Sequence, residues 1–332
     1  MSRPVALHTG PWMDVPLEEL AQTASEWGYQ GLDLACGGDH LEVQRALSQP
    51  DYCSRLLELL ARCELSVTGI SNHRVGQAIG DVIDARHQAW LPDYVWGDGQ
   101  PAEVRQRAVE EMVDTIRVAQ KLGVAVVSGF TGSALWPAIA SFPPPTPRQI
   151  AELLRQFADT WEPILDVCQE CGVRFALEVA PGQIAFDLHS AEQVLDALPG
   201  RAEFGFAFSP AQLHWQGVDP VEFARRFPER IYQVFIADIA LSLSGRSGIF
   251  NSYLPSGDPR RGWDWRSPGH GGIDWEGVIR AVHASGYDGP LTVHWQDPGM
   301  DRDHGADDAC KFVQRLDFPA PSRDAAEPFR EV

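Results

Sequence analysis

Residues 164–180 read ILDVCQECGVRFALEVA, and this stretch contains the unit from which the whole chain is built. An amphipathic helical segment ends before Gly172, and an apolar strand follows at once and closes on Glu178. Glycine is the expected residue after a last helical turn, because it adopts the left-handed conformation without a Cβ penalty. The stretch therefore predicts a helix, a glycine cap and a buried strand.

The same order of helix, glycine and strand recurs in LEELAQTASEWGYQGLDLA (17–35), TIRVAQKLGVAVVSGF (115–130) and VIRAVHASGYDGPLTVHW (278–295). This alternation predicts a parallel sheet. The apolar runs predict eight strands, near 4–9, 30–35, 65–71, 124–129, 174–180, 203–208, 231–237 and 290–295. The predicted helices lie near 16–27, 49–62, 101–122, 146–171, 190–198, 219–227, 274–285 and 302–315.

Eight βα units favour a closed (β/α)8 TIM barrel, because closure removes the strand edges that an open sheet must protect. A doubly wound open sheet is the alternative, but no G-x-G-x-x-G motif follows the first strand. We expect a single barrel over 1–318, with long loops at 72–100 and 239–273 that lack periodicity, as lids and binding loops often do. A Pro-rich, polar surface tail is predicted at 319–332.

Composition and charge restrict the compartment and the partners. No apolar run reaches 18 residues, and MSRPVALHTG lacks the apolar core and cleavage site of a signal peptide, so we expect a cytoplasmic protein with no membrane partner. A net charge of −19 without a basic cluster argues against nucleic acid. The expected partner is a small-molecule substrate, and the outward helices and long loops leave a homodimer open.

The barrel prediction also locates the site. Active sites of such barrels lie at the C-terminal ends of the strands. The polar and aromatic residues that close or follow the predicted strands are His8, Asp33, Asp39, His40, Ser71, Asn72, His73, Thr131, Trp136, Glu178, Ser209, Gln212, Phe235, Asp238, His294 and Gln296.

Over about residues 4–318 the chain resembles the xylose-isomerase-like barrels grouped as sugar phosphate isomerases and epimerases. The resemblance lies in segments such as SNHRVGQAIGDVIDARH (71–87), LEVAPGQIAFDLHSAEQVLDAL (177–198) and GDPRRGWDWRSPGHGGIDWEGVIRAV (257–282). It implies one divalent metal in the barrel mouth, held by a glutamate, an aspartate, a histidine and a second glutamate from strands five to eight. It also implies proton transfer between adjacent carbons of a sugar or cyclitol.

The metal ligands implied by the resemblance transfer only in part. Glu178 in ALEVAP matches the fifth-strand glutamate, but Ser209 and Gln212 stand where an aspartate and a histidine are expected. Phe235 replaces a seventh-strand histidine, and His294 replaces the eighth-strand glutamate. A hard divalent cation needs several anionic oxygens. We therefore predict no metal and no other cofactor, with a divalent metal on Glu178 and His294 as the lesser alternative.

Three residues are predicted to be catalytic. Glu178 and His294 are expected to form an acid/base pair across the barrel mouth, in which the carboxylate raises the pKa of the imidazole. The alternatives are that His294 only fills the space of a departed ion or acts as a substitute ligand. Asp238 is expected to orient a neighbour or the ligand, although an aspartate at a strand end is as often a cap.

The predicted substrate-binding residues share a place near the barrel mouth or in a long loop. The resemblance implies substrate contact for His73, Trp136 offers an aromatic face to a sugar ring, and Arg260 offers local positive charge. The full set is His73, His40, Trp136, Ser209, Gln212, Phe235, Gln296 and Arg260.

Together these features predict a metal-independent isomerase- or epimerase-type enzyme, or a related lyase or cyclase, that moves a proton on a polyol-like, sugar-like or natural-product substrate. The alternatives are a non-catalytic binding protein that keeps the pocket without the chemistry, and a metal-dependent isomerase with an unusual ligand set.

Overall fold

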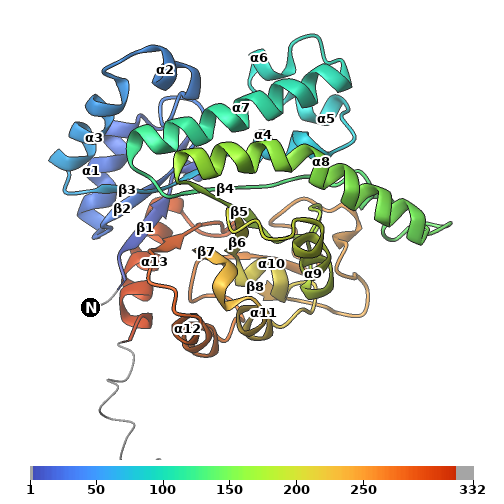
Figure 1. Cartoon of the computed structure of the whole chain (residues 1–332). Helices are drawn as coiled ribbons and strands as arrows, with labels where there is room; N and C mark the ends of the chain where they lie inside the picture. Colours follow the sequence, from blue (N-terminus) through green and yellow to red (C-terminus); the bar gives the residue numbers. More distant parts are fainter. Residues whose placement is uncertain (1–2, 319–332) are drawn as a thin grey trace, which may run out of the picture.

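The computed structural model describes residues 3–318, and its eight parallel strands close into a barrel (Figure 1). The barrel strands are β1 (Val5–His8), β2 (Gly31–Ala35), β3 (Ser66–Ser71), β4 (Val126–Gly129), β5 (Arg174–Glu178), β6 (Phe204–Phe208), β7 (Ile231–Ile236) and β10 (Leu291–Val293). Their order around the barrel is β1-β10-β7-β6-β5-β4-β3-β2. The predicted (β/α)8 fold and all eight predicted strands are confirmed, while the predicted tail at 319–332 lies outside the described residues.

The eight predicted helices are also present. They are α1 (Leu17–Trp27), α3 (Tyr52–Arg62), α7 (Pro101–Leu122), α8 (Pro147–Cys171), α9 (Leu188–Ala197), α11 (Pro220–Arg226), α12 (Trp275–Ala284) and α13 (Arg302–Leu316). Figure 1 shows α7 and α8 lying side by side along one side of the barrel. None of the helices within 3–318 is long and apolar enough to cross a membrane.

The glycine caps work as the sequence predicts. Gly123 and Gly172 end α7 and α8 with φ of +69° and +66°. The N–H groups of the residues after them bond back to Ala119 and Cys168, both at 2.9 Å. This arrangement satisfies helix carbonyls that would otherwise lack donors and turns the chain directly into the next strand.

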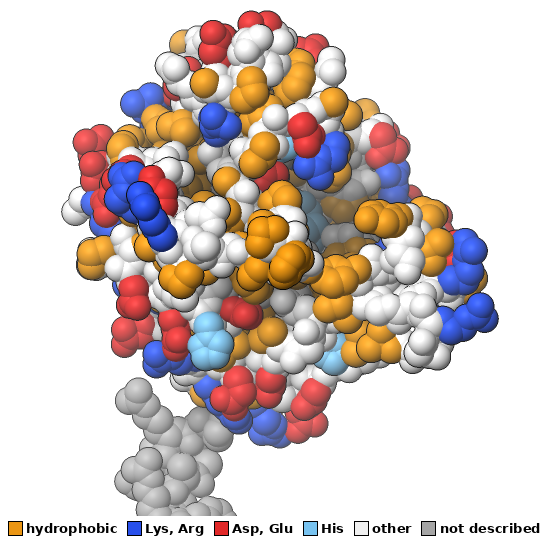
Figure 2. All heavy atoms as spheres, turned by 90° about the vertical axis from the view of Figure 1, so that its right-hand side faces the viewer, with side chains coloured by type: hydrophobic (Ala, Val, Ile, Leu, Met, Phe, Trp, Pro, Cys, Tyr) orange, Lys and Arg blue, Asp and Glu red, His pale blue; other side chains and the backbone are white. Residues whose placement is uncertain are grey.

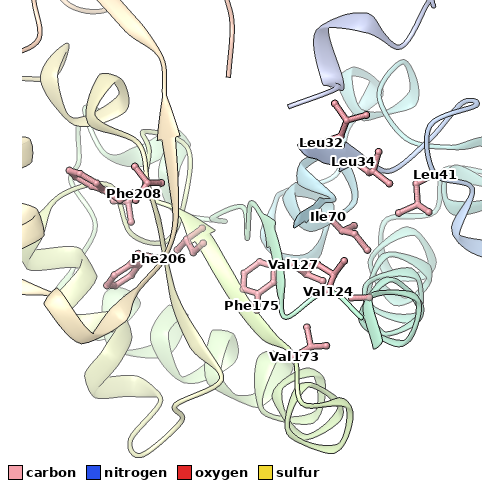
Figure 3. Close-up of a cluster of buried hydrophobic side chains, with 14 of the residues drawn as sticks. Leu32, Leu34, Leu41, Ile70, Val124, Val127, Val173, Phe175, Phe206 and Phe208 are labelled. Carbon is pink, nitrogen blue, oxygen red and sulfur yellow. The ribbon is translucent and has the colours of Figure 1, made fainter. Parts of the chain in front are cut away.

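The core fills the space between the strands and the surrounding helices (Figure 3). Leu32, Ile70, Val127 and Phe175, from four neighbouring strands, have no solvent-exposed surface. Trp161 of α8 packs on Phe175 with ring centroids 4.4 Å apart. Burying each such side chain stabilises the fold by about 1.5–3 kcal/mol, so the barrel is a rigid support for the residues at its mouth.

The two long connections are more regular than predicted. The first contains α4 (His73–Gly80), α5 (Ala85–Gln88) and α6 (Asp93–Trp96). The second contains the antiparallel pair β8 (Asp238–Leu241) and β9 (Trp263–Arg266). A further helix, α2 (Val43–Ser48), and α10 (Pro210–His214) were not predicted either. Helices of four to eight residues span too few turns for a 3.6-residue period to reveal them.

Candidate active site

A cavity of about 440 Å³ opens at the C-terminal ends of the strands, and we call it the central cavity. Figure 2 shows a hollow on the face of the molecule that is turned to the viewer. Histidine atoms, in pale blue, lie inside this hollow. A second hollow of about 310 Å³, the side cavity, shares five lining residues with the central one: His73, Arg74, Trp90, Phe130 and Gln212. Of the residues predicted to be catalytic or substrate-binding, His73, Glu178, Gln212, His294 and Gln296 line the central cavity. His8, Ser71 and Asn72, which follow or close predicted strands, line it too.

Glu178, the last residue of β5, is the only carboxylate among the described residues that line the central cavity. Its Oε2 lies 2.9 Å from Nε2 of His73, the first residue of α4, and its Oε1 accepts a hydrogen bond from Gln212 at 3.4 Å. Burial raises the pKa of the Glu178 carboxyl, but the hydrogen bond and charge of His73 outweigh burial and lower that pKa to about 2. The side chain is therefore ionised at neutral pH.

An ionised carboxylate fixes the tautomer of the histidine beside it. Because Glu178 can only accept, His73 places its proton on Nε2, which leaves Nδ1 as the basic nitrogen. Among the described residues Nδ1 of His73 has no hydrogen-bond partner, and the ring lines both cavities. The pair has the arrangement of a base oriented by a carboxylate.

The predicted pairing of Glu178 with His294 is corrected by the structure, which gives the carboxylate to His73. The backbone N–H of His294 bonds to Ile236 at 3.0 Å. The ring lies edge-on to His8 and Phe235, with centroids 4.4 Å and 5.2 Å away. Burial and the charge of His8 lower the pKa of His294 to about 3, against the predicted rise. His294 is thus a neutral imidazole at pH 7.

This lowered pKa predicts a pH dependence of stability. Unfolded His294 binds a proton below about pH 6.5 but the folded ring does not, so its contribution is full above that pH and is lost as the pH falls toward about 3. His294→Gln should reduce the difference in unfolding free energy between about pH 7.5 and about pH 5 by on the order of 2 kcal/mol, measured by urea denaturation. An unchanged difference would contradict the lowered pKa.

Two other predicted residues support the site without lining the central cavity. Phe235 of β7 has no exposed surface and lies about 6 Å from the rings of His8 and His73, as measured between centroids. Ser209 is buried at the start of α10, and its hydroxyl helps to lower the pKa of Glu178. Gln212 and Gln296 do line the central cavity.

Four predicted residues lie elsewhere. Asp238 is buried with its carboxylate fully used, as it accepts hydrogen bonds from Trp275 at 2.8 Å and from three backbone N–H groups. These hydrogen bonds anchor the second long connection to the end of a barrel strand. His40 is buried and bonded to the carbonyl of Val15 at 3.0 Å. Neither lines any cavity described above.

Arg260 and Trp136 are also absent from the lining of both cavities. Arg260 is exposed and pairs with Asp258, two residues before it in the same turn. Trp136 packs edge-on to Phe186 with centroids 5.4 Å apart. Residue type does not show in which direction a loop side chain points. The sequence analysis therefore assigned Arg260 and Trp136 to the pocket although their side chains point elsewhere.

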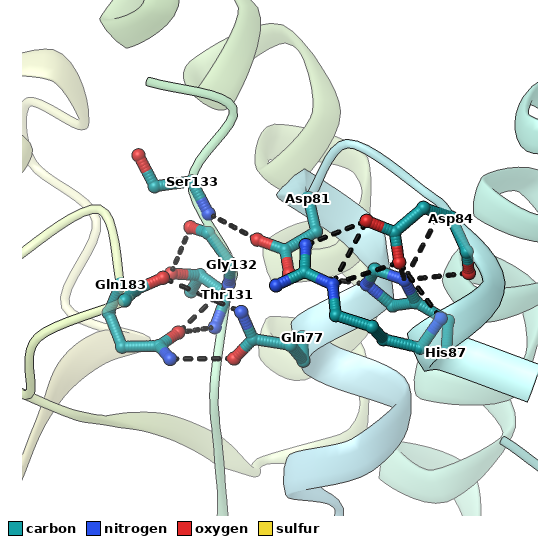
Figure 4. A network of polar contacts seen from close by, with 10 residues as sticks. Gln77, Asp81, Asp84, His87, Thr131, Gly132, Ser133 and Gln183 are labelled. Atoms are coloured by element: carbon teal, nitrogen blue, oxygen red, sulfur yellow. Dashed lines mark hydrogen bonds and ion pairs between the residues drawn. The ribbon is translucent and has the colours of Figure 1, made fainter. Parts of the chain in front are cut away.

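Polar contacts fix the outer wall of the side cavity (Figure 4). Gln183 accepts from the backbone N–H groups of Thr131 and Gly132, both at 2.9 Å, and donates to Gln77 of α4 at 2.6 Å. Asp81 accepts from Ser133 at 3.0 Å. These bonds join the loops after β3, β4 and β5, so α4 and its His73 are held in a defined position.

Several residues that line the central cavity were missed by the sequence analysis. Arg74, Trp90 and Phe130 line the central cavity, and the Arg74 guanidinium lies 5.7 Å from the centroid of the Trp90 ring. Arg74 and Phe130 each directly follow a predicted site residue or strand, which was the available signal. Trp90 lies in a connection whose path the sequence did not reveal.

The donor set does not fit the divalent metal that the family resemblance implies. No group of three or more His, Cys, Asp or Glu side chains among residues 3–318 is arranged to hold an ion. The oxygens of Glu178 are directed to His73 and Gln212, and Phe235 presents carbon where a ligand is expected. Such a site lacks the anionic oxygens that a hard cation requires.

Comparison with known proteins gives a family match and a set of similar folds. The family described as Xylose isomerase-like TIM barrel matches residues 21–316. A xylose isomerase domain protein from Planctomyces limnophilus is 17% identical with a TM-score of 0.62, covering 95% of this chain and 98% of its own. No curated protein sequence matches the chain.

Two enzymes are among the similar structures. The probable 3-DHS dehydratase AsbF from Bacillus anthracis is 16% identical with a TM-score of 0.65, over 94% of this chain and 98% of its own. The 3-keto-D-glucoside 4-epimerase YcjR from E. coli is 12% identical with a TM-score of 0.66, over 94% and 99%. At these identities the likeness is one of fold.

Proposed function

Because this chain belongs to the xylose isomerase-like TIM barrel family, we propose that it is an isomerase- or epimerase-type enzyme that moves a proton beside a carbonyl group without a metal. The observation that carries the proposal is the buried, ionised Glu178 bonded to His73 at 2.9 Å on the wall of the central cavity. A carboxylate that orients an imidazole next to a cavity is an arrangement typical of general acid/base catalysis.

His73 is the base in this proposal. Its Nδ1 removes a proton from the carbon next to the carbonyl, and Glu178 stabilises the imidazolium that forms. Glu178 itself stays ionised, because its pKa of about 2 is far below that of an imidazole. This differs from the predicted role of Glu178 as a direct partner of His294.

His294 supplies the second part of the chemistry. Loss of the C–H proton leaves an enolate oxygen that needs a hydrogen-bond donor. A neutral imidazole, kept uncharged by its lowered pKa, donates an N–H without giving up its proton. Gln212 adds an amide donor on the same cavity wall. These neutral donors replace part of the stabilisation that the metal implied by the family resemblance would supply.

Loss of water from a β-hydroxy carbonyl compound begins with the same proton abstraction, so a lyase is the second candidate. The similar fold of a probable 3-DHS dehydratase supports the lyase as a candidate. The third is a non-catalytic binding protein. The neutral and apolar replacements at Ser209, Gln212 and Phe235 support that one.

The test is exchange of carbon-bound hydrogen in heavy water. Protein treated with a chelator is incubated with D-tagatose, L-ribulose and 3-DHS, the compounds named for similar structures, and deuterium uptake is followed by NMR. We expect exchange with at least one compound, unchanged by the chelator. Exchange that disappears with the chelator and returns with Mn²⁺ contradicts metal independence. Binding measured by calorimetry without any exchange favours the binding protein.

A further inference from the structure

Arg74 and Trp90 lie where three cavities meet. Besides the central and side cavities there is a third cavity of about 370 Å³. It shares five lining residues with the central cavity, namely Met13, Cys36, Asn72, Arg74 and Trp90. Of the described residues, only Arg74 and Trp90 line all three cavities. A ligand in the central cavity can therefore reach the guanidinium of Arg74.

Arg74 is a cation without an anionic partner within the protein. It is the second residue of α4 and is exposed, and among residues 3–318 its side chain forms no ion pair and no hydrogen bond. The other arginines that line the side and third cavities, Arg86 and Arg45, are paired with Asp84 and Glu42. In a chain with a net charge of −19, an unpaired guanidinium beside a cavity is a local positive charge that a ligand can use.

Trp90 holds this guanidinium without using its hydrogen-bond donors. The guanidinium carbon of Arg74 lies over the indole ring, 5.7 Å from the ring centroid. The aromatic face attracts the cation, while the N–H groups of the guanidinium point outward along its edges. Trp90 keeps 61% of its surface exposed, which is unusual for so large an apolar side chain. The indole therefore acts as a platform that limits the positions of the guanidinium and leaves its donors free.

The charges around the central cavity favour a ligand with a single negative charge. Among the described residues that line it, Glu178 is the only carboxylate and Arg74 the only Lys or Arg. Ionised Glu178 repels an anion, and one guanidinium offsets one charge. A carboxylate carries one charge, and its two oxygens match the planar fork of a guanidinium. A phosphate monoester carries about −1.5 to −2 at pH 7, and this lining offers no second cation for it.

We propose that Arg74, positioned by Trp90, binds a carboxylate of the substrate, so that the substrate is a sugar acid and not a neutral sugar. Arg74 directly follows His73, and both residues line the central cavity, so one small molecule can contact both. The inference rests on the proposed function and names its substrate class. That class is a ketose-like compound with a C–H group beside its carbonyl and one carboxylate.

The first test compares sugars that differ only in the acid group. D-Tagaturonate and D-fructuronate carry a carboxylate where D-tagatose and D-fructose carry a CH2OH group. The binding of all four compounds to the wild type and to Arg74→Gln is measured by calorimetry. We expect the wild type to bind each acid about 10- to 10²-fold more tightly than its parent sugar, which is the worth of hydrogen bonds to a charged group. Arg74→Gln should lose this preference.

The matched control is Arg315→Gln. Arg315 is also exposed on a helix, forms no ion pair among residues 3–318 and lines none of the three cavities. This variant should keep the preference for acids. Equal binding or no binding of acids and neutral sugars by the wild type overturns the proposal, as does a preference that Arg74→Gln retains. Inorganic phosphate that binds more tightly than either acid, and only when Arg74 is present, overturns the assignment to a carboxylate.

Two substitutions test the positioning role of Trp90. Trp90→Phe keeps an aromatic face under the guanidinium and should keep most of the preference for acids. Trp90→Ala should reduce the ratio of acid binding to neutral-sugar binding by about two- to fivefold, the worth of an exposed cation–π contact. A residue that only shapes the cavity would weaken acids and neutral sugars alike, so an equal loss for both overturns the positioning role.

Deuterium exchange separates this inference from the proposed function. If D-tagaturonate binds through Arg74 but no compound exchanges hydrogen for deuterium, the proposed function fails while the carboxylate site stands. If D-tagatose exchanges in Arg74→Gln as in the wild type, and the wild type exchanges D-tagaturonate no faster, the carboxylate site fails while the proposed function stands.

Discussion

Glu178→Gln is expected to lower turnover by about 10²- to 10⁴-fold while the barrel remains folded. Glutamine has nearly the same shape, and the neighbouring His73 and Gln212 keep a polar partner at that position. The amide has no charge, however, so the imidazolium of His73 loses the carboxylate that stabilises it. The measurement is the rate of deuterium exchange or product formation, with circular dichroism to confirm the fold.

The control for this variant is Glu26→Gln, which removes one negative charge from an exposed position of α1. It should keep wild-type turnover, which separates loss of the buried charge from a change of net charge. Full activity in Glu178→Gln would exclude Glu178 from the chemistry.

Asp238→Ala is expected to destabilise the protein by roughly 3–5 kcal/mol, because it leaves several buried donors without an acceptor. The indole N–H of Trp275 and the backbone N–H groups of Ile239 and Gly269 all bond to this carboxylate within 3.0 Å. The predicted effect is on folding, since the side chain lines neither cavity. Urea denaturation measures the unfolding free energy.

The matched control is Asp288→Ala, which truncates an exposed aspartate in the turn before β10 and should change stability by less than about 0.5 kcal/mol. Turnover per folded molecule of Asp238→Ala should stay close to wild type at low temperature. Normal stability combined with lost turnover would instead restore the catalytic role that the sequence suggested.

Local patterns in the sequence predict the elements of the barrel but not the contacts between distant elements. Strands and long helices were predicted to within a few residues, because apolar periodicity and residues such as Gly123 and Gly172 act over short stretches of chain. The place of Glu178 at a strand end also followed from this pattern. The short elements α4 and β8–β9 could not be predicted from this pattern, because contacts with distant segments hold them in place.

By itself the sequence determined the eight-stranded barrel and the edge of the sheet where the candidate site lies. Only the tertiary structure decided which side chains meet. Glu178 is bonded to His73, 105 residues away, and not to His294. Strand register and the path of each loop set these distances, and both depend on packing across the whole barrel rather than on any local pattern.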